Sequence, residues 1–400
     1  MRTVFWPLVG TTWMQTIASI MYLTVPIMAP ALLDDFGFTP GHVGLYTALV
    51  FLGAMPVSLF MGALSKRFGA LRVMQTGLLM SATGLLLSNY TFLPLLLACG
   101  FLLGMGYGPN TPGAAHILAR ITKAKDRPLV FSIKQSGAPL GGFLAGLLIP
   151  WIAVTVGWRE ALIFAAALGI ITVFMVQPLR ANADDDRQPG SAISIHGVWQ
   201  QLHLLAGNRV LRRLTLASFI YAGIQNCLLA YMVIYLVDHV GLDLIRAGFA
   251  YACMHLIGVG ARIAWGWIAD RFIPAAIVLA GLGIASAIFV LIIAQFTPQT
   301  PFWVIVTISA AAGATAASWN GVFLAEVIRA APPNQGAAAT GGVIFFTYFG
   351  LVVGPTVFAA VISISGGYTE AFYVIAGAIF AAALMILPRR DKTSPDPHIS

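Results

Sequence analysis

Long apolar runs dominate this 400-residue sequence and leave few folds open to it. A helix needs about 20 consecutive apolar residues to cross a bilayer, and runs of this kind cover well over half of the chain. Only 9% of the residues are charged, whereas soluble domains carry roughly 25%. The composition therefore excludes a soluble enzyme, a disordered regulator and a nucleic-acid-binding protein, although the net charge is +8. It predicts an all-α polytopic membrane protein.

Hydropathy and the positions of charged residues, glycine and proline predict twelve transmembrane helices. The predicted spans are 5–33, 42–64, 71–91, 93–119, 128–154, 158–179, 213–237, 245–269, 273–296, 302–328, 335–363 and 368–388. One long polar segment, which contains Asp184, Asp185 and Asp186, divides them into two sets of six. The expected organisation is a six-helix bundle over 1–179, a cytoplasmic central loop over 180–212, a second six-helix bundle over 213–390 and a cytoplasmic tail over 391–400.

The distribution of basic residues predicts the orientation. Of the 22 Lys and Arg residues, 18 fall in segments on the same side as the N-terminus. Two lie on the other side, Arg159 and Arg246, and two lie within spans, Lys134 and Arg262. Cytoplasmic loops carry the excess of Lys and Arg. We therefore expect a multi-pass protein of the cytoplasmic membrane with both termini in the cytoplasm.

The two halves of the sequence also repeat each other. At a constant shift of 204, Asp34, Gly37, Gly44, Gly62, Arg67 and Phe68 recur as Asp238, Gly241, Gly248, Gly266, Arg271 and Phe272. Asn110 corresponds to Asn320 at a shift of 210. Because each half has six spans, both copies enter the membrane in the same direction. Parallel repeats of this kind are typical of secondary transporters.

The loops between spans 2 and 3 and between spans 8 and 9 carry a specific resemblance. Gly266-Trp-Ile-Ala-Asp270-Arg271-Phe272 resembles the G-x-x-x-D-R loop of the major facilitator superfamily, and Gly62-Ala-Leu-Ser-Lys66-Arg67-Phe68-Gly69 is its counterpart in the first half. The resemblance implies two pseudo-symmetric six-helix bundles, a central cavity lined by spans 1, 4, 7 and 10, alternating access and a monomer.

The same resemblance implies a gate at these loops. In the family, the aspartate of the motif pairs with basic groups across the interface between the bundles. The gating role can be carried over to Asp270, together with Gly62, Arg67, Gly266 and Arg271. Lys66 stands where the first loop usually has aspartate, so symmetric gating is not expected.

Three ionisable residues lie inside predicted spans: Lys134, Arg262 and Glu326. A charge within the bilayer is costly and is a functional candidate by default. Lys134 shares a helical face with small residues, and Arg262 shares one with His255 at i−7. The resemblance makes spans 5 and 8 neighbours and so brings the two cations together. The alternative is that either side chain extends to the membrane surface.

Two residues are candidates for proton coupling. Glu326 is the only acid inside a predicted span, but Arg329 at i+3 offers a local ion pair instead. His255 is a stronger candidate, because a histidine beside a cation can titrate near physiological pH. Its alternative role is simple packing.

Neutral polar and aromatic residues complete the expected cavity. The candidates are Gln135, Asn110, Asn320, Tyr22, Tyr107, Tyr221, Asn226, Trp319 and Tyr348. Asn110 and Asn320 are the favoured pair, because the repeat places them symmetrically and a buried amide needs a hydrogen-bond partner. Hydrogen bonding between helices is the alternative for each.

The leading functional hypothesis is a secondary active transporter of a small organic anion, coupled to protons or to anion exchange. The predicted spans contain two cations and one carboxylate, and that carboxylate has its own nearby arginine. The cavity is therefore expected to carry a net positive charge, and a bound anion would offset the cost of burying the cations. Family members that carry oxalate or monocarboxylates use an arginine on span 8, which Arg262 resembles. Arg262 would bind the carboxylate with its planar fork, and Lys134 would be a second, more mobile charge.

Other functions have weaker support. Gly137-Ala-Pro139-Leu-Gly141-Gly142 partly resembles the span-5 motif of drug antiporters, so efflux of hydrophobic compounds is the main alternative. An intramembrane enzyme or a non-transporting sensor is more remote, because no catalytic spacing and no long soluble domain is evident. Neither a cofactor nor a metal site is predicted. The expected partners are a small anionic substrate, the lipid bilayer and a proton or counter-ion.

Overall fold

The computed structural model describes residues 2–32, 39–90, 92–123, 127–191, 203–332 and 336–387. Twelve of its helical segments are long and apolar enough to cross a membrane, which confirms the predicted number of spans and the fold class. The helices are α1 (Arg2–Met28), η1 (Ala29–Leu32), α3 (Pro40–Phe68), α4 (Ala70–Leu87), α5 (Leu93–Tyr107), α6 (Asn110–Ile121), α7 (Arg127–Gln135), α8 (Gly137–Thr155), α9 (Trp158–Val176), η3 (Gln177–Leu179), α10 (Arg180–Ala183), α12 (Arg209–Asp238), α13 (Leu244–Arg271), α14 (Ala275–Ile293), α15 (Phe302–Ala316), α16 (Asn320–Ala330), α17 (Gly336–Ser365) and α18 (Tyr368–Ile386).

Three of the twelve spans consist of two α-helices separated by a break. The fourth consists of α5 and α6, the fifth of α7 and α8, and the tenth of α15 and α16. Proline explains two of the breaks, because it lacks an N–H and cannot donate to the carbonyl four residues earlier. Pro109 stands directly before α6, and Pro139 lies in the first turn of α8. Such breaks leave backbone carbonyls free for other partners.

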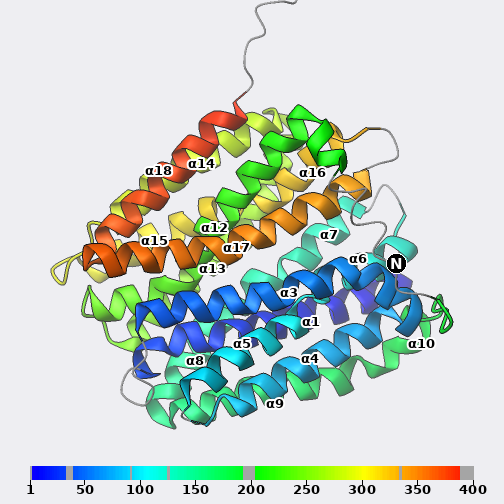
Figure 1. Cartoon of the computed structure of the whole chain (residues 1–400), viewed down its shortest axis with the longest axis horizontal. Helices are drawn as coiled ribbons and strands as arrows, with labels where there is room; N and C mark the ends of the chain where they lie inside the picture. Colours follow the sequence, from blue (N-terminus) through cyan, green and yellow to red (C-terminus); the bar gives the residue numbers. More distant parts are fainter. Residues whose placement is uncertain are drawn as a thin grey trace, which may run out of the picture.

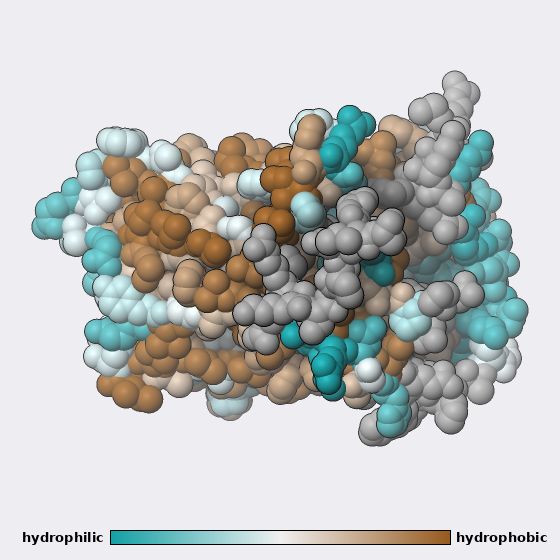
Figure 2. All heavy atoms as spheres, turned by 90° about the horizontal axis from the view of Figure 1, so that it is seen from above, coloured by the Kyte–Doolittle hydropathy of each residue, from teal (hydrophilic) through white to brown (hydrophobic). Residues whose placement is uncertain are grey.

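The helices form two groups (Figure 1). Helices α1 to α10 lie together in the lower half of the view, and α12 to α18 lie in the upper half. Apolar side chains cover the middle of the surface in Figure 2, and hydrophilic ones gather at the end that carries α10. We call this end the central-segment side and the other end the far side. The assignment of the central-segment side to the cytoplasm and the exact boundaries of the two bundles stay predictions. The predicted tail at 391–400 lies outside the described residues.

The two groups of helices touch closely on the far side. The Tyr231 hydroxyl of α12 lies 3.0 Å from the Pro40 carbonyl of α3 and 3.1 Å from the Pro355 carbonyl of α17. A Cβ atom on Gly146 of α8 would come within 2.8 Å of the Gly248 carbonyl of α13, so glycine is needed for this close approach.

The helices are less tightly enclosed toward the central-segment side. A Cβ atom on Gly62 of α3 or Gly266 of α13 would meet no other atom within 4 Å. The glycines of the repeated loops therefore have no close neighbour here, whereas Gly44 and Gly248, nearer the far side, lie against the other bundle. This conformation is closed on the far side.

A segment after α10 binds the start of α4 on the central-segment side. Gly69 precedes α4 with a φ of 95° and has no side chain to cap the helix. Asp184 caps it instead, and its carboxylate accepts hydrogen bonds from the Leu71 and Arg72 backbone N–H groups at 2.8 and 3.1 Å. Burial raises the pKa of Asp184, and the hydrogen bond from Arg120 lowers the pKa of Asp185.

Asp184→Ala should destabilise the first bundle by about 1–2 kcal/mol, the usual range for loss of a helix N-cap. The reason is that two N–H groups at the start of α4 would lose their only side-chain acceptor. Thermal unfolding of the purified protein measures the effect. Asp185→Ala is the matched control, because the Asp185 side chain is 58% exposed. Equal melting temperatures for both variants would contradict this capping role.

Candidate functional site

A cavity of about 170 Å³ lies between the two groups of helices. Its walls come from both halves of the chain, from α1, α3 and α5–α8 on one side and from α12, α13, the turn between α15 and α16, α16 and α17 on the other. Eight of the predicted site residues line it: Tyr22, Tyr107, Gln135, His255, Arg262, Trp319, Asn320 and Tyr348. Neither aspartate nor glutamate is among the lining residues that the structure describes.

Arg262 crosses the interface between the bundles. Its Nε donates to the Ala317 carbonyl at 2.9 Å, and one terminal nitrogen donates to the Gln135 carbonyl at 3.2 Å. Both carbonyls are free because of helix breaks. Pro139 cannot donate to Gln135 within the helix, and Ala317 directly follows the end of α15. A guanidinium has five N–H donors, so three remain for a ligand.

Lys134 lies directly behind the cavity wall. Its side chain is 1% exposed, and its Nζ lies 3.1 Å from Gln15 Oε1, 3.1 Å from Gln135 Oε1 and 3.5 Å from Thr111 Oγ1. An ammonium has three donors, and these three oxygens use them all. All three partners are neutral and line the cavity. Lys134 thus makes the site more positive without reaching into it.

Gln135 links the two cations. Its side-chain oxygen accepts from Lys134 and its backbone oxygen accepts from Arg262. The residue ends α7, immediately before the break that separates α7 from α8. The sequence predicts that spans 5 and 8 are neighbours only through the family resemblance. The structure adds a direct hydrogen bond between them, from Arg262 to the Gln135 carbonyl.

His255 is buried at the cavity wall without a hydrogen-bond partner. Its side chain is 4% exposed, and neither ring nitrogen has a partner among the residues that the structure describes. The ring packs against Gly142 of α8, where a Cβ atom would clash with it, and against Tyr251 at 4.7 Å between ring centroids. The glycine therefore makes room for the imidazole at the interface.

Aromatic rings from both bundles form another part of the cavity wall. The Tyr22, Phe51 and Tyr107 rings contact one another, with centroids 5.2 to 6.1 Å apart, and Phe51 lies 6.1 Å from the Tyr348 ring. On the other side of the cavity, Gln225 Oε1 accepts hydrogen bonds from Trp319 Nε1 at 3.0 Å and from Asn320 at 3.3 Å.

Several predicted residues do not line this cavity. Asn110, the first residue of α6, is fully buried, and its amide donates to the Gly106 and Tyr107 carbonyls at the end of α5. The Tyr221 hydroxyl donates to Leu279 at 2.8 Å. Asn226 accepts from the Tyr22 hydroxyl at 2.5 Å, which joins α1 and α12 at repeat-equivalent positions. Glu326 pairs with Arg329 at 2.9 Å, the local alternative that the sequence offers.

The proposed gating residues lie outside the cavity as well. Asp270 is exposed, and no ion pair of its carboxylate is found in the described part of the chain. Arg271 stacks over the Trp267 ring at 5.7 Å. The gating role of these residues stays a prediction, and Gly62 and Gly266 have no neighbour within 4 Å of an added Cβ atom in this conformation.

Phe51 and Thr111 are lining residues that sequence reasoning missed. The resemblance directs attention to spans 1, 4, 7 and 10, and Phe51 belongs to the second span. A signal for it exists, because Phe51 follows the repeated Gly44 by seven residues. It therefore shares the face that contacts the other bundle.

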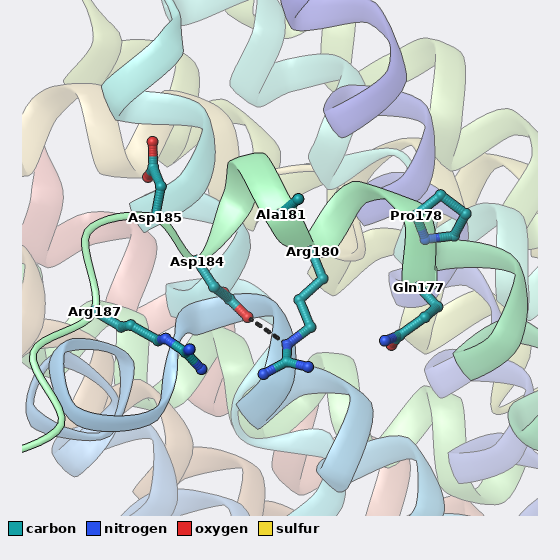
Figure 3. Close-up of a pocket in the computed structure, with 7 residues that line it drawn as sticks. All are labelled: Gln177, Pro178, Arg180, Ala181, Asp184, Asp185 and Arg187. Carbon is teal, nitrogen blue, oxygen red and sulfur yellow. Dashed lines mark ion pairs between the residues drawn. The ribbon is translucent and has the colours of Figure 1, made fainter.

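A larger hollow of about 610 Å³ lies at the surface on the central-segment side (Figure 3). The Asp184 carboxylate turns toward Arg180 there, at 3.7 Å, while the Asp185 side chain points the other way. Its wall carries two acidic and two basic residues, and its described lining comes from residues 177–187 alone, so it does not lie between the bundles. The cavity between the bundles, whose wall carries Arg262 and no acidic residue among those described, is therefore the better candidate site.

The sequence is similar to a known family of membrane proteins over most of its length. The family model of the Major Facilitator Superfamily matches residues 12–355. The chain belongs to this superfamily. Its relatives include a nitrite extrusion protein of Bacillus subtilis (strain 168), 26% identical over 88% of this chain and 86% of the relative. A probable sulfoacetate transporter of Cupriavidus necator is 24% identical over 96% of this chain and 94% of the relative.

A solved structure has the same fold. It is a bacterial homolog of the human lysosomal transporter Spinster, in its inward-facing and unoccupied conformation. Its TM-score is 0.72 at 16% sequence identity, over 95% of this chain and 94% of that chain. Membership of the major facilitator superfamily confirms the resemblance seen in the sequence, and it establishes a membrane transporter and not an enzyme.

Pro139→Ala should weaken the contact that orients Arg262. Alanine would supply an N–H to the Gln135 carbonyl and so compete with the Arg262 hydrogen bond. Loss of one such bond corresponds to roughly a threefold to tenfold weaker affinity for a ligand of Arg262, measured by binding to the purified protein. Pro56→Ala in α3 is the control, because Pro56 is exposed and far from Arg262 in the chain. Equal affinities for both variants would contradict this role of Pro139.

Proposed function

We propose that this protein is a secondary active transporter of a small organic anion that carries a carboxylate. The observation that supports this most is the Arg262 guanidinium, which is fixed at the cavity by two backbone carbonyls and keeps three donors free. A planar fork of this kind binds a carboxylate with two parallel hydrogen bonds. Lys134 adds positive charge from behind the wall, and the described lining supplies no acid to neutralise it.

The names of two relatives also support an anionic substrate. One is described as extruding nitrite and the other as a probable carrier of sulfoacetate, and both substrates are small anions. A lipophilic cation, the usual cargo of drug efflux, would meet two cationic side chains at this site. An anion meets complementary charge and offsets the cost of their burial.

Alternating access supplies the transport step in this proposal. If the central-segment side is cytoplasmic, the conformation described here faces inward. Asp270 and Arg271 would then close that side in the other state, and Lys66 would contribute little. Transport would be coupled to protons or to a counter-anion, with His255 and Glu326 as the candidate proton carriers. His255 is better placed, since it lines the cavity and Glu326 is paired with Arg329.

Counterflow in proteoliposomes tests the proposal. Vesicles are loaded with an unlabelled carboxylate and diluted into a trace of the same carboxylate carrying a label. The labelled acid should transiently accumulate inside the vesicles above its external concentration. Such accumulation requires a carrier and not a channel. The panel should include aliphatic and aromatic monocarboxylates, a dicarboxylate and a lipophilic cation. Counterflow of the cation and of none of the acids would overturn the anion proposal and favour drug efflux.

A further inference from the structure

The size of the cavity restricts the anion to a small molecule. Its volume is about 170 Å³, whereas sites for drug-sized ligands have roughly 300–1,000 Å³. A cavity of about 150 Å³ is enough for a benzene ring. The space therefore fits a single ring with a small substituent.

The wall formed by Tyr22, Phe51, Tyr107 and Tyr348 favours a flat aromatic body. These rings come from four helices, α1, α3, α5 and α17, and so from both bundles. They meet at interplanar angles between 46° and 82°, which leaves both edges and faces toward the space they enclose. Aromatic pairs prefer edge-to-face or offset arrangements at such distances. An aliphatic acid would use the apolar area but not this geometry.

The polar groups of the cavity define two ends for the ligand. Arg262 marks one end with its three remaining donors. His255 marks the other, because it lies two helical turns away on α13, about 10 Å along the axis. Both its nitrogens lack a partner although the side chain is 96% buried. A buried polar group without a hydrogen bond is costly. His255 lines the cavity, and a small rotation of its ring on ligand binding would let the ligand supply the missing partner.

We propose that the substrate is an aromatic monocarboxylate whose ring carries a hydrogen-bonding group, such as a hydroxyl, opposite the carboxylate. The carboxylate binds Arg262, the ring lies against Phe51 and Tyr348, and the ring substituent bonds to His255. This inference rests on the proposed function and narrows it to one substrate class. No covalent step is involved.

The test compares acids that differ in one feature at a time. Counterflow of labelled benzoate in proteoliposomes is competed with 4-hydroxybenzoate, cyclohexanecarboxylate, acetate and succinate. We expect 4-hydroxybenzoate to compete best and benzoate to follow. Cyclohexanecarboxylate, which keeps the size and charge but lacks the aromatic ring, should be roughly tenfold weaker than benzoate. Acetate and succinate should be weaker still.

Variants separate the two contacts. Phe51→Leu should weaken benzoate binding about tenfold and weaken cyclohexanecarboxylate binding less, because leucine keeps part of the apolar area but not the aromatic ring. His255→Phe should remove the preference for 4-hydroxybenzoate over benzoate. Phe349→Leu is the matched control, because Phe349 follows Tyr348 in the chain but is 43% exposed on the outer surface. It should leave the whole ranking of acids unchanged, and thermal unfolding checks that each variant is folded.

The outcomes distinguish this inference from the proposed function. Counterflow of aliphatic acids with no preference for aromatic ones would overturn the inference and leave carboxylate transport standing. Benzoate competing as well as 4-hydroxybenzoate in the unaltered protein would overturn the assignment of His255. An absence of counterflow with every acid would overturn both.

Discussion

Arg262→Ala abolishes high-affinity substrate binding if the cavity is the anion site. The expected loss is about 2–5 kcal/mol, the range for removing one partner of a buried charged pair, which corresponds to an affinity at least roughly 30-fold weaker. The reason is that no other cation lines the cavity among the residues the structure describes. Lys134 cannot replace it, since its three donors are already used.

Arg262→Lys refines this prediction. A lysine keeps the positive charge but cannot form the planar fork, so affinity should lie between that of the unaltered protein and that of Arg262→Ala. Arg246→Ala is the matched control on the same helix, because Arg246 is 64% exposed near the far side and pairs locally with Asp243. Binding is measured on purified protein whose folding is checked by thermal unfolding. Unchanged affinity in Arg262→Ala would end the anion proposal.

The architecture follows from the sequence because hydropathy and repeats are encoded locally. All twelve predicted spans coincide with a membrane-length helix, most within four residues at each end. The repeated glycines also mark real contacts, as Gly44 and Gly248 lie against the opposite bundle. These features depend on residue type and spacing along one helix, which a single sequence displays directly.

The candidate site is less accessible to the same reasoning, because it depends on how helices face one another. The sequence identifies Arg262, Lys134 and His255 as unusual, but it does not reveal that Pro139 frees the Gln135 carbonyl for Arg262. It also gives Asn110 a cavity role by symmetry with Asn320, whereas only Asn320 lines the cavity. The repeat relates backbone positions, and the side chains at those positions have diverged.

Lys134→Met should have opposite effects on stability and on binding. In the unaltered protein, a cation that is 1% exposed is held by three neutral oxygens and has no acidic partner in the described structure. Burial of an uncompensated charge is destabilising, and methionine fills a similar volume without that cost. The substrate-free variant should therefore melt at a higher temperature, despite the hydrogen bonds lost by Gln15, Thr111 and Gln135.

Substrate affinity should fall in the same variant. A unit charge one side-chain layer behind the wall, about 8 Å from the anion, contributes roughly 2 kcal/mol at an effective dielectric constant near 20, or roughly 30-fold in affinity. Lys123→Met is the matched control, because Lys123 is exposed at the end of the same span as Thr111 and should change neither quantity. Melting curves with and without substrate measure both effects on one sample. If Lys134→Met lowers the melting temperature and leaves affinity unchanged, Lys134 serves to hold α1, α6 and α7 together, and the positive charge behind the wall has no part in binding the anion.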